Sequence, residues 1–353
     1  MLKITKLSKI YVFCPAWSAT GGVESLHQLI DKLNNTGFQA FAVYIDHKKE
    51  IQKHIIVRQE YSSYNIRVTS NVEENLSNIF IFAEVDADLI FRYTNCQRVI
   101  YWLSVDNFYW SFRHNLSHLD MLKWDLKYAI KTNLLGKYFH LFIKRDKSKQ
   151  KTLKISDIRN AEVFHAYQSK YAQNFLFTNK FYYIIELNDY INKNYSVNQT
   201  NEYKNKGNAV LYNPKKGMQF TKKLIKRAPH INWIALENLN RTQIVDMLNK
   251  NKIYIDFGEH PGRDRLPREA VMNGCCIITG KKGSSSYFED MPIDSEYKFD
   301  NKISEIGKII KKIELILKDY EIHNRNFDFY RTIAIADEKK LELLIDKILK
   351  PLL

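Results

Sequence analysis

The chain has 353 residues, of which 45% are hydrophobic and 26% are charged, and this composition excludes a disordered protein. Its length is sufficient for two domains. The 54 Lys and Arg residues outnumber the 39 Asp and Glu residues, which gives a net charge of +15. We therefore expect an acidic partner, which could be nucleic acid, an anionic lipid surface or a phosphorylated substrate.

The four cysteines form no CxxC pair, and the sequence shows no metal-ligand spacing. We expect them to be small buried hydrophobic residues in a reducing compartment, and we predict no metal site. Residues 1–9 are too polar for the apolar core of a signal peptide, and no apolar run is long enough for a membrane span. The predicted location is cytoplasmic, with peripheral attachment to the inner membrane as an open alternative.

The chain begins with a strand at 10–14, a turn of small residues at 16–22, a helix, and a second strand at 38–45. Gly21 and Gly22 in the turn would let the backbone approach a ligand closely. The alternative is a tight turn that contacts no ligand. The turn does not have the GxGxxG pattern, so a dinucleotide-binding loop is not indicated.

Further strands are predicted at 79–83, 89–93 and 99–104, and Asp106 and Asn107 follow the last of them. Catalytic groups gather beyond the carboxyl ends of parallel strands, which makes Asp106 a candidate catalytic residue. An Asx turn or a helix cap explains these two residues equally well.

The segment 107–154 is rich in aromatic residues and ends in a basic stretch at 144–154. Aromatic and basic residues together could dock on an anionic membrane surface, or could stack on single-stranded nucleic acid. The alternative is a pair of buried helices followed by a solvated loop.

His165 lies in a predicted strand at 162–167, where it could bond a substrate hydroxyl, although a lone histidine is more often structural. Residues 188–207 are rich in Asn, Lys and Tyr and are the best candidate for a linker. We therefore predict an N-terminal domain at 1–187 and a second domain at 208–330.

The second half restarts with a strand at 209–212, and the loop behind it carries Lys215 and Lys216. Two lysines at the carboxyl end of a strand, next to a helix N-terminus, suit a diphosphate. Strands at 231–236 and 253–257 follow, with a helix between them. Because both halves alternate strands with helices, we predict an α/β fold of two doubly wound, Rossmann-like domains that face each other across a cleft.

A charged loop follows the strand at 253–257 and leads into a helix predicted to start at Glu269. Ligands of such folds bind at this rim of the sheet, so we expect its side chains to be open to a ligand. Arginine can clamp a phosphate in a bidentate way, and a carboxylate can accept two sugar hydroxyls. The candidate donor-binding residues of this segment are His260, Arg263, Arg265, Arg268 and Glu269.

Three segments in the right order resemble GT-B glycosyltransferases, and among them the family four type that builds bacterial surface polysaccharides. The segments are 21–24, 213–217 and 260–274. The resemblance implies that Glu269 holds the ribose hydroxyls of a nucleotide sugar, that Lys216 neutralises its diphosphate, and that Gly22 lets the backbone approach the donor or acceptor. It also implies retention of anomeric configuration, no metal or other cofactor, and a final helix, at 331–353, that crosses back to the N-terminal domain.

Two positions depart from the family pattern. The family has a glutamate eight positions before the one that corresponds to Glu269, but this chain has Pro261 there. The family also has an arginine five positions before the lysine that corresponds to Lys216, but this chain has Leu211 there. Phosphate contacts could then fall to the arginines of the 260–274 segment.

The function that the resemblance implies is transfer of a sugar from a nucleotide-sugar donor to a glycan or lipid-linked acceptor, in the synthesis of capsule, lipopolysaccharide or another surface polysaccharide. Asp106 would position the acceptor, or serve as the base if the reaction inverts. One alternative is a nucleotide-sugar 2-epimerase of the same fold, which the aromatic and basic segment 107–154 disfavours. Another is a nucleic-acid-binding protein, for which no recognised motif is present.

Overall fold

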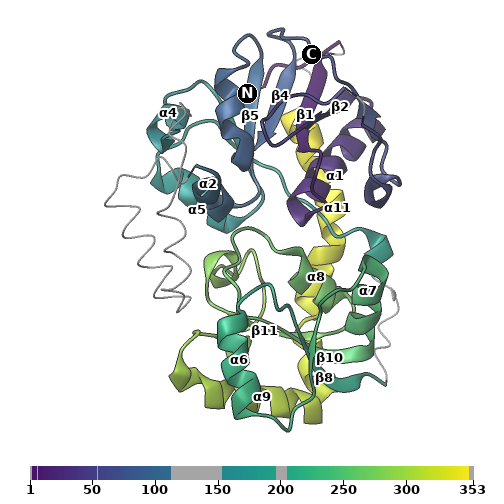
Figure 1. Cartoon of the computed structure of the whole chain (residues 1–353), viewed down its shortest axis with the longest axis vertical. Coiled ribbons are helices and arrows are strands. Elements are labelled where there is room, and N and C mark those ends of the chain that lie inside the picture. The colour runs from purple at the N-terminus through teal and green to yellow at the C-terminus, as the bar shows by residue number, and fades with distance from the viewer. Residues whose placement is uncertain (1, 6, 54, 113–152, 196–204, 350–353) are drawn as a thin grey trace.

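The structure is a computed structural model that describes residues 2–5, 7–53, 55–112, 153–195 and 205–349. It has two lobes, each built around a parallel β-sheet (Figure 1). The chain passes between the lobes at two places, through the segment after residue 187 and through the long last helix. Most of the aromatic and basic segment, 113–152, lies outside the described residues.

The N-terminal sheet has seven strands that all pair in parallel. Its central strands are apolar and buried on both faces, which is the pattern expected when helices cover both sides of a parallel sheet. In sheet order the strands are β3 (Arg67–Val68), β2 (Gln39–Ile45), β1 (Lys9–Pro15), β4 (Ile79–Ala83), β5 (Gln97–Trp102), β6 (Phe164–Tyr167) and β7 (Ile184–Glu186).

The C-terminal sheet has five parallel strands with β10 at its centre. In sheet order they are β12 (Lys298–Phe299), β11 (Cys276–Gly280), β10 (Asn251–Asp256), β8 (Gly207–Tyr212) and β9 (Trp233–Ala235). With the seven-stranded sheet, they give the two-domain, Rossmann-like architecture that the alternation of strands and helices predicts, and this prediction is confirmed.

Helices connect most of these strands. Polar side chains start several of them: Ser169 caps α5 by accepting a hydrogen bond from the amide of Ala172 at 3.1 Å, and Asn240 and Gln243 form a capping box at α7. The α-helices are α1 (Gly21–Asn35), α2 (Val105–Ser111), α4 (Ile155–Arg159), α5 (Lys170–Thr178), α6 (Met218–Arg227), α7 (Arg241–Lys250), α8 (Arg265–Met272), α9 (Ile306–Lys318), α10 (Tyr320–Arg325) and α11 (Asp328–Ile348). The 3₁₀-helices are η1 (Gln59–Tyr61), η2 (Glu84–Phe91), η5 (Lys193–Tyr195), η6 (Gly283–Ser286), η7 (Ser295–Tyr297) and η8 (Ile303–Glu305).

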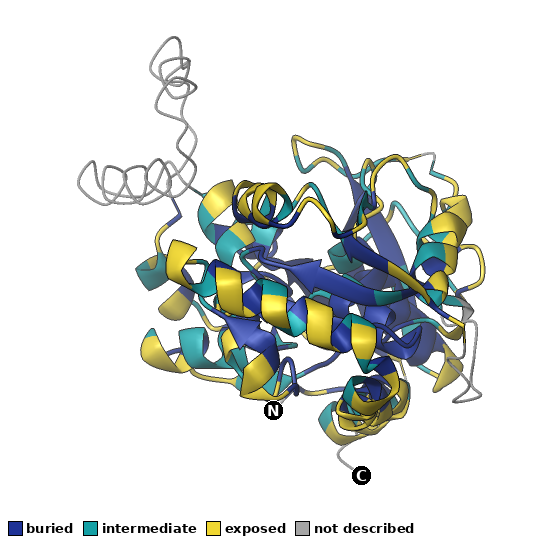
Figure 2. Cartoon of the chain, turned by 90° about the horizontal axis from the view of Figure 1, so that it is seen from below, coloured by how far each residue is buried: buried dark blue, intermediate teal, exposed yellow. Residues whose placement is uncertain are grey.

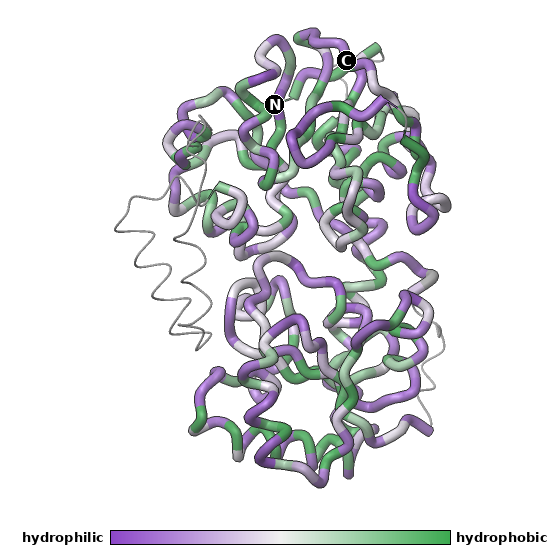
Figure 3. The backbone as a smooth tube through the Cα atoms, viewed as in Figure 1, coloured by the Kyte–Doolittle hydropathy of each residue, from purple (hydrophilic) through white to green (hydrophobic). Residues whose placement is uncertain are grey.

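Buried residues are concentrated in the sheets, whereas the outer helices are buried along one side only (Figure 2). The hydropathy of the backbone follows the same division, since the strands are the most hydrophobic segments and the outer loops are hydrophilic (Figure 3). Apolar side chains on the two faces of the N-terminal sheet form separate clusters: one packs against α1 and the end of α11, and the other is rich in aromatic rings. Both sheets are therefore cores, and their edges carry the polar loops.

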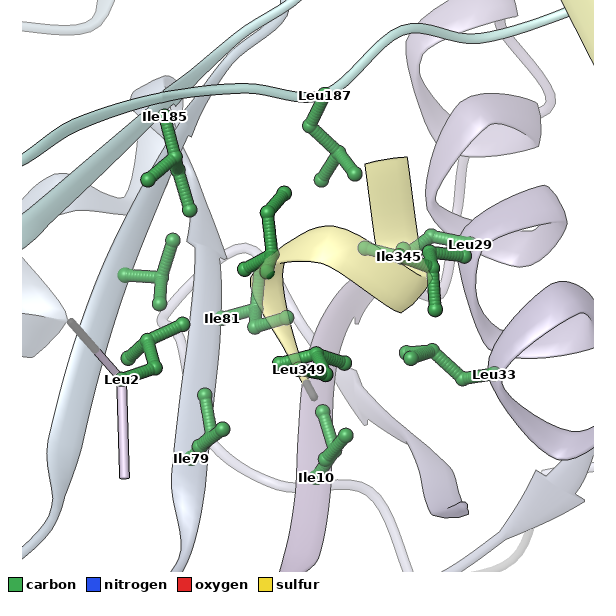
Figure 4. A pocket seen from close by; sticks show the side chains of 12 residues that line it. Leu2, Ile10, Leu29, Leu33, Ile79, Ile81, Ile185, Leu187, Ile345 and Leu349 are labelled. Atoms are coloured by element: carbon green, nitrogen blue, oxygen red, sulfur yellow. The ribbon is translucent and has the colours of Figure 1, made fainter. Parts of the chain in front are cut away.

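The last helix, α11, starts beside the C-terminal sheet and ends against the N-terminal one (Figure 1). Its residues Leu341 and Ile345, and Leu349 directly after it, are buried in the same cluster as Ile10 of β1 and Leu29 of α1. The close-up in Figure 4 shows Ile345 and Leu349 surrounded by aliphatic side chains of β1, β4 and α1, around a residual cavity of about 30 Å³. The C-terminal end of the chain thus completes the N-terminal core.

Two predicted elements differ from the structure. The prediction of a strand at 89–93 is wrong, because residues 84–91 form η2, in which Ala87, Leu89 and Ile90 are buried while Asp88 is partly exposed and pairs with Lys49. The prediction that a helix starts at Glu269 is also wrong, because α8 starts at Arg265. Pro267 fits in its first turn, where a backbone amide has no partner within the helix. Among the helices in the described part of the chain, none combines the length and the apolar character that a membrane crossing requires.

Candidate functional site

A cavity of about 710 Å³ lies between the two lobes, where the carboxyl ends of the two sheets face each other. Its N-terminal wall contains residues that follow β1, β4 and β5. Its C-terminal wall contains Lys216, the start of α7, and residues 261–266, which include the start of α8. Ligands of open α/β sheets bind at this position, so the cavity is the candidate site.

Gly21 and Gly22 both line the cavity, at the start of α1. A Cβ atom at Gly21 would lie 2.6 Å from Cδ of Arg265, which belongs to the opposite lobe. At Gly22 the nearest atom is Cδ1 of Leu103, at an ordinary 3.5 Å. A side chain at position 21 would therefore force the side chain of Arg265 to shift from its present position.

Lys216 lines the cavity, and its ammonium lies 2.8 Å from the carboxylate of Asp264. Asp264 also contacts Nδ1 of the buried His260 at 2.8 Å, and Nε2 of that ring lies 3.6 Å from Asp256. Burial opposes a charge on His260, but the two carboxylates outweigh it and raise the pKa of the ring. Burial raises the pKa of Asp264, but Lys216 and His260 outweigh that effect and lower it.

The ligand atoms of Asp256, His260 and Asp264 lie within 4.8 Å of one another, a spacing that could hold a metal ion. The carboxylate of Asp264 is already paired with the ammonium of Lys216 at 2.8 Å, however, and the raised pKa of His260 favours a proton over a metal ion on that ring. This arrangement fits a buried chain of alternating charges better than a metal centre.

The three arginines of the charged segment are engaged in ion pairs between distant elements. Arg263 pairs with Asp337 of α11 at 2.9 Å. Arg265 pairs with Glu24 of α1 at 3.1 Å. Arg268 is completely buried and holds both carboxylate oxygens of Asp189, at 2.9 and 2.8 Å. The arginine side chains therefore join the two lobes, and a phosphate contact would require a different arrangement of Arg263 or Arg265.

Glu269 is fully buried, so the expectation of an open rim position is wrong. One carboxylate oxygen pairs with Arg241, which lines the cavity, and the other is buried with no hydrogen-bond partner. The guanidinium of Arg241 also lies over the ring of Tyr195, 4.0 Å from its centre. In this arrangement Arg241 stands between Glu269 and the cavity, so a ribose would reach Glu269 only after Arg241 moves.

The candidate catalytic residues of the N-terminal half occupy different environments. Asp106 lies in the first turn of α2 and accepts a hydrogen bond from the hydroxyl of Tyr171 at 2.8 Å, while its neighbour Asn107 lines the cavity. His165 is buried, and its Nδ1 accepts a hydrogen bond from the indole of Trp102 at 3.1 Å. Burial lowers the pKa of His165 to about 3, so the ring is neutral. This environment favours a packing role for His165 over a substrate contact.

Lys215 is exposed beside Lys216, and its amide donates to the side chain of Asn213 at 2.9 Å. The turn is closed by Gly217, at a φ of 60°, where a Cβ atom would collide with the backbone of Phe257. This geometry turns Lys216 to the cavity, and it is Lys216 that the cavity contains.

Sequence reasoning did not single out Glu84, which lines the cavity directly after β4. The side chain is buried, and its Oε2 accepts a hydrogen bond from the amide of Leu103 at 3.0 Å. Burial raises the pKa of Glu84 to about 8. The sequence could have identified Glu84 as a candidate site residue, because it follows a predicted buried strand just as Asp106 does.

The lobes also touch beside the cavity. The amide of Val105 donates to the carbonyl of Pro261 at 3.0 Å. The carboxylate of Asp290 accepts hydrogen bonds from the amides of Lys170 and Tyr171, at 2.6 and 3.0 Å, and so caps α5 from the opposite lobe. A side chain at position 262 would collide with the carbonyl of Leu103. The cavity is thus bounded by direct contacts between the lobes.

The chain matches no protein-family model and no curated protein. Among solved structures, it is similar to sucrose-phosphate synthase from Thermosynechococcus elongatus, at 9% identity over 97% of this chain and 98% of that one, with a TM-score of 0.64. It is similar to HepE of Anabaena, solved with UDP-glucose, at 11% identity over 97% and 99% of the two chains, with a TM-score of 0.59. It is also similar to the catalytic domain of starch synthase IV from Arabidopsis thaliana, solved with ADP and acarbose, at 10% identity over 98% and 99%, with a TM-score of 0.56. The chain has the GT-B fold of nucleotide-sugar glycosyltransferases.

Proposed function

We propose that this chain is a glycosyltransferase that moves a sugar from a nucleotide-sugar donor to a glycan or lipid-linked acceptor. The observation that carries the proposal is the cavity between the carboxyl ends of the two sheets, whose C-terminal wall holds Lys216, Arg241, Arg263 and Arg265. Lys216 suits the diphosphate of such a donor, and the three arginines could join it only after leaving their present ion pairs. Solved structures of the same fold hold UDP-glucose or ADP, which agrees with this assignment.

The chemistry follows from these groups. When the sugar leaves, negative charge develops on the diphosphate, and a fixed ammonium such as that of Lys216 stabilises it. Lys216 is already ordered by Asp264 at 2.8 Å, so it would pass from that carboxylate to the phosphate. Contacts between the lobes exclude water and hold donor and acceptor together.

The finer assignments also belong to this proposal. The resemblance implies synthesis of a surface polysaccharide, such as capsule or lipopolysaccharide, with retention and without a metal. The aromatic and basic composition of 107–154 suggests attachment to an anionic membrane. Retention is tested by comparing the anomeric proton coupling of donor and product by NMR. Independence of a metal is tested by measuring transfer in the presence of EDTA.

The proposal is tested by thermal unfolding of the whole chain with UDP, GDP, ADP and TDP and their glucose conjugates. A nucleotide at a hundredfold its Kd stabilises the folded state by about 2.7 kcal/mol. We expect one base to raise the Tm, and we expect Lys216→Met to lose most of that rise. Lys215→Met is the matched control, because that neighbouring lysine is exposed.

Two results would contradict the proposal. One is a Tm that no nucleotide changes. The other is an equal loss in Lys215→Met and Lys216→Met, which would indicate a general attraction between a basic protein and an anion.

A further inference from the structure

His260 is a buried residue to which the proposed chemistry gives no role. It lies in the loop after β10, next to residues 261–266 of the cavity wall, and its side chain is completely buried. Its φ of 47° falls in the left-handed region, which strains a residue that has a Cβ atom. Strain of this kind persists only where the surroundings impose it, and it is most frequent at functional sites. The conformation of His260 therefore points to a role in the neighbouring site.

The surroundings of His260 fix the position of its ring. Its carbonyl accepts a hydrogen bond from the amide of Ser284 at 2.8 Å. Its Nε2 lies 3.4 Å from the carbonyl and 3.6 Å from the carboxylate of Asp256. That carboxylate is buried and accepts hydrogen bonds from the hydroxyl of Tyr254 and the amide of Gly258, both at 2.9 Å. One end of the imidazole is thus held by an anchored carboxylate.

The other end of the ring faces Asp264, which is shared by two basic side chains. One oxygen of Asp264 lies 2.8 Å from the ammonium of Lys216, and the other lies 2.8 Å from Nδ1 of His260. Both ring nitrogens of His260 therefore face carboxylates, and only an imidazolium carries a proton on each of them. The raised pKa of His260 agrees with a charged ring. A single carboxylate in the cavity wall thus lies between two cations.

A bound diphosphate would change this balance. To reach a phosphate, the ammonium of Lys216 must leave Asp264, whose side chain is only 13% exposed. An unpaired carboxylate at such a position is costly, and that cost would weaken the binding of the ligand. An imidazolium that stays 2.8 Å away keeps the carboxylate paired, so that Lys216 changes partners at a smaller cost.

We propose that His260 is a positioning residue of the donor site, whose imidazolium keeps Asp264 paired while Lys216 turns to the diphosphate. This inference rests on the proposed function and adds how the site exchanges one anionic partner of Lys216 for another. Asp264 orders the ammonium before the ligand arrives, and His260 prevents that carboxylate from retaining it.

The test measures the Kd of UDP, GDP, ADP and TDP for the whole chain by isothermal titration calorimetry. His260→Asn removes the charge, and asparagine tolerates the left-handed backbone better than most residues. We expect the Kd of the nucleotide that binds the wild-type chain to rise about tenfold in this variant, because Lys216 would leave Asp264 unpaired.

The double variant His260→Asn, Asp264→Asn separates this role from a structural one. It removes the stranded carboxylate, so it should bind the nucleotide more tightly than His260→Asn alone and recover most of the loss. A loop that is merely damaged by the loss of the ring would not be repaired by a second substitution. His230→Asn is the matched control, because His230 is exposed, pairs with Glu314 at 2.9 Å and lies outside the cavity; its Kd should be unchanged.

Asp264→Asn alone tests the same point without altering the strained residue. Lys216 then has no carboxylate to leave, so this variant should bind the nucleotide more tightly than the wild type, by up to about fivefold, which is the contribution of one partly exposed ion pair. Urea unfolding followed by circular dichroism shows whether each variant is folded. If His260→Asn does not fold, the Asp264→Asn result decides.

Three results would overturn the inference. They are an unchanged Kd in His260→Asn, a double variant that binds as weakly as His260→Asn, and weaker binding in Asp264→Asn than in the wild type. The proposed function would survive each of them, provided that the wild-type chain binds a nucleoside diphosphate and Lys216→Met does not. A wild-type chain that binds no nucleoside diphosphate would remove the proposed function and the inference together.

Discussion

Replacing Arg268 by methionine should destabilise the protein strongly, even though methionine keeps an unbranched apolar stem in place of the arginine stem. Arg268 is completely buried and donates to both carboxylate oxygens of Asp189, at 2.9 and 2.8 Å, and to the carbonyl of Arg263 at 3.0 Å. Asp189 is itself buried, and without Arg268 its remaining ion-pair partner in the described part of the chain is Arg265, at 3.4 Å, with a longer-range attraction from Arg263. Removing one partner leaves an uncompensated buried charge, which costs about 3–5 kcal/mol.

Urea unfolding followed by circular dichroism at pH 7 measures this loss. The double variant Arg268→Met, Asp189→Asn removes both charges, so we expect its cost to be smaller than the sum of the single costs by about 2 kcal/mol. Lys308→Met is the matched control, because Lys308 is 70% exposed in its pair with Glu305 and such pairs contribute at most about 1 kcal/mol. A loss in Arg268→Met as small as that of the control, or simple additivity in the double variant, would refute the reasoning.

Three further perturbations test other parts of the structure. Burial raises the pKa of Glu84 from 4.5 to about 8, so folding takes up a proton and stability falls as the pH rises through this window. Relative to the Glu84→Gln variant, the free energy of unfolding should drop by on the order of 3 kcal/mol between pH 5 and pH 7. Parallel curves of stability against pH for the two proteins would contradict this. Ile345→Ala should lower the free energy of unfolding in urea by about 2–4 kcal/mol, because the Ile345 side chain fills the N-terminal core. Ile335→Ala, on an exposed face of the same helix, should lower it by less than about 0.5 kcal/mol. Equal losses in the two variants would argue against that packing. Asp290→Ala should lower the Tm, because two amides of α5 lose their hydrogen-bond acceptor and each loss costs about 1 kcal/mol of stability. An unchanged Tm would indicate that water replaces the carboxylate.

The alternation of apolar runs with helical patterns was sufficient to predict both sheets, because strands buried on both faces read as continuous apolar segments. The segment 84–91 shows where that signal is ambiguous. A short run that contains Leu89, Ile90 and Phe91 fits a strand or a helical turn equally well, and the packing of η2 against β4 and β5 decided the outcome.

The ion pairs of the candidate site could not be predicted in the same way. Arg268 and Asp189 are 79 positions apart, and nothing in either local sequence identifies the other as its partner. The sequence therefore identified a cluster of arginines and gave it a phosphate-binding role, whereas the structure shows those side chains holding the lobes together. Lys216 lines the cavity, and its position depends on a local turn that ends at Gly217, which is readable from the sequence; its contact with a diphosphate stays a prediction.

The return of α11 to the N-terminal lobe has a consequence for the order of events during synthesis. The strands β1 and β4 and the helix α1 leave the ribosome early, but Ile345 and Leu349, which fill the space between them, are made only after the whole C-terminal sheet. Until then the surface formed by Ile10, Leu29 and Ile79 is exposed to water. The nascent N-terminal lobe therefore carries an uncovered apolar groove through most of translation. It becomes a finished domain only after α11 has been made.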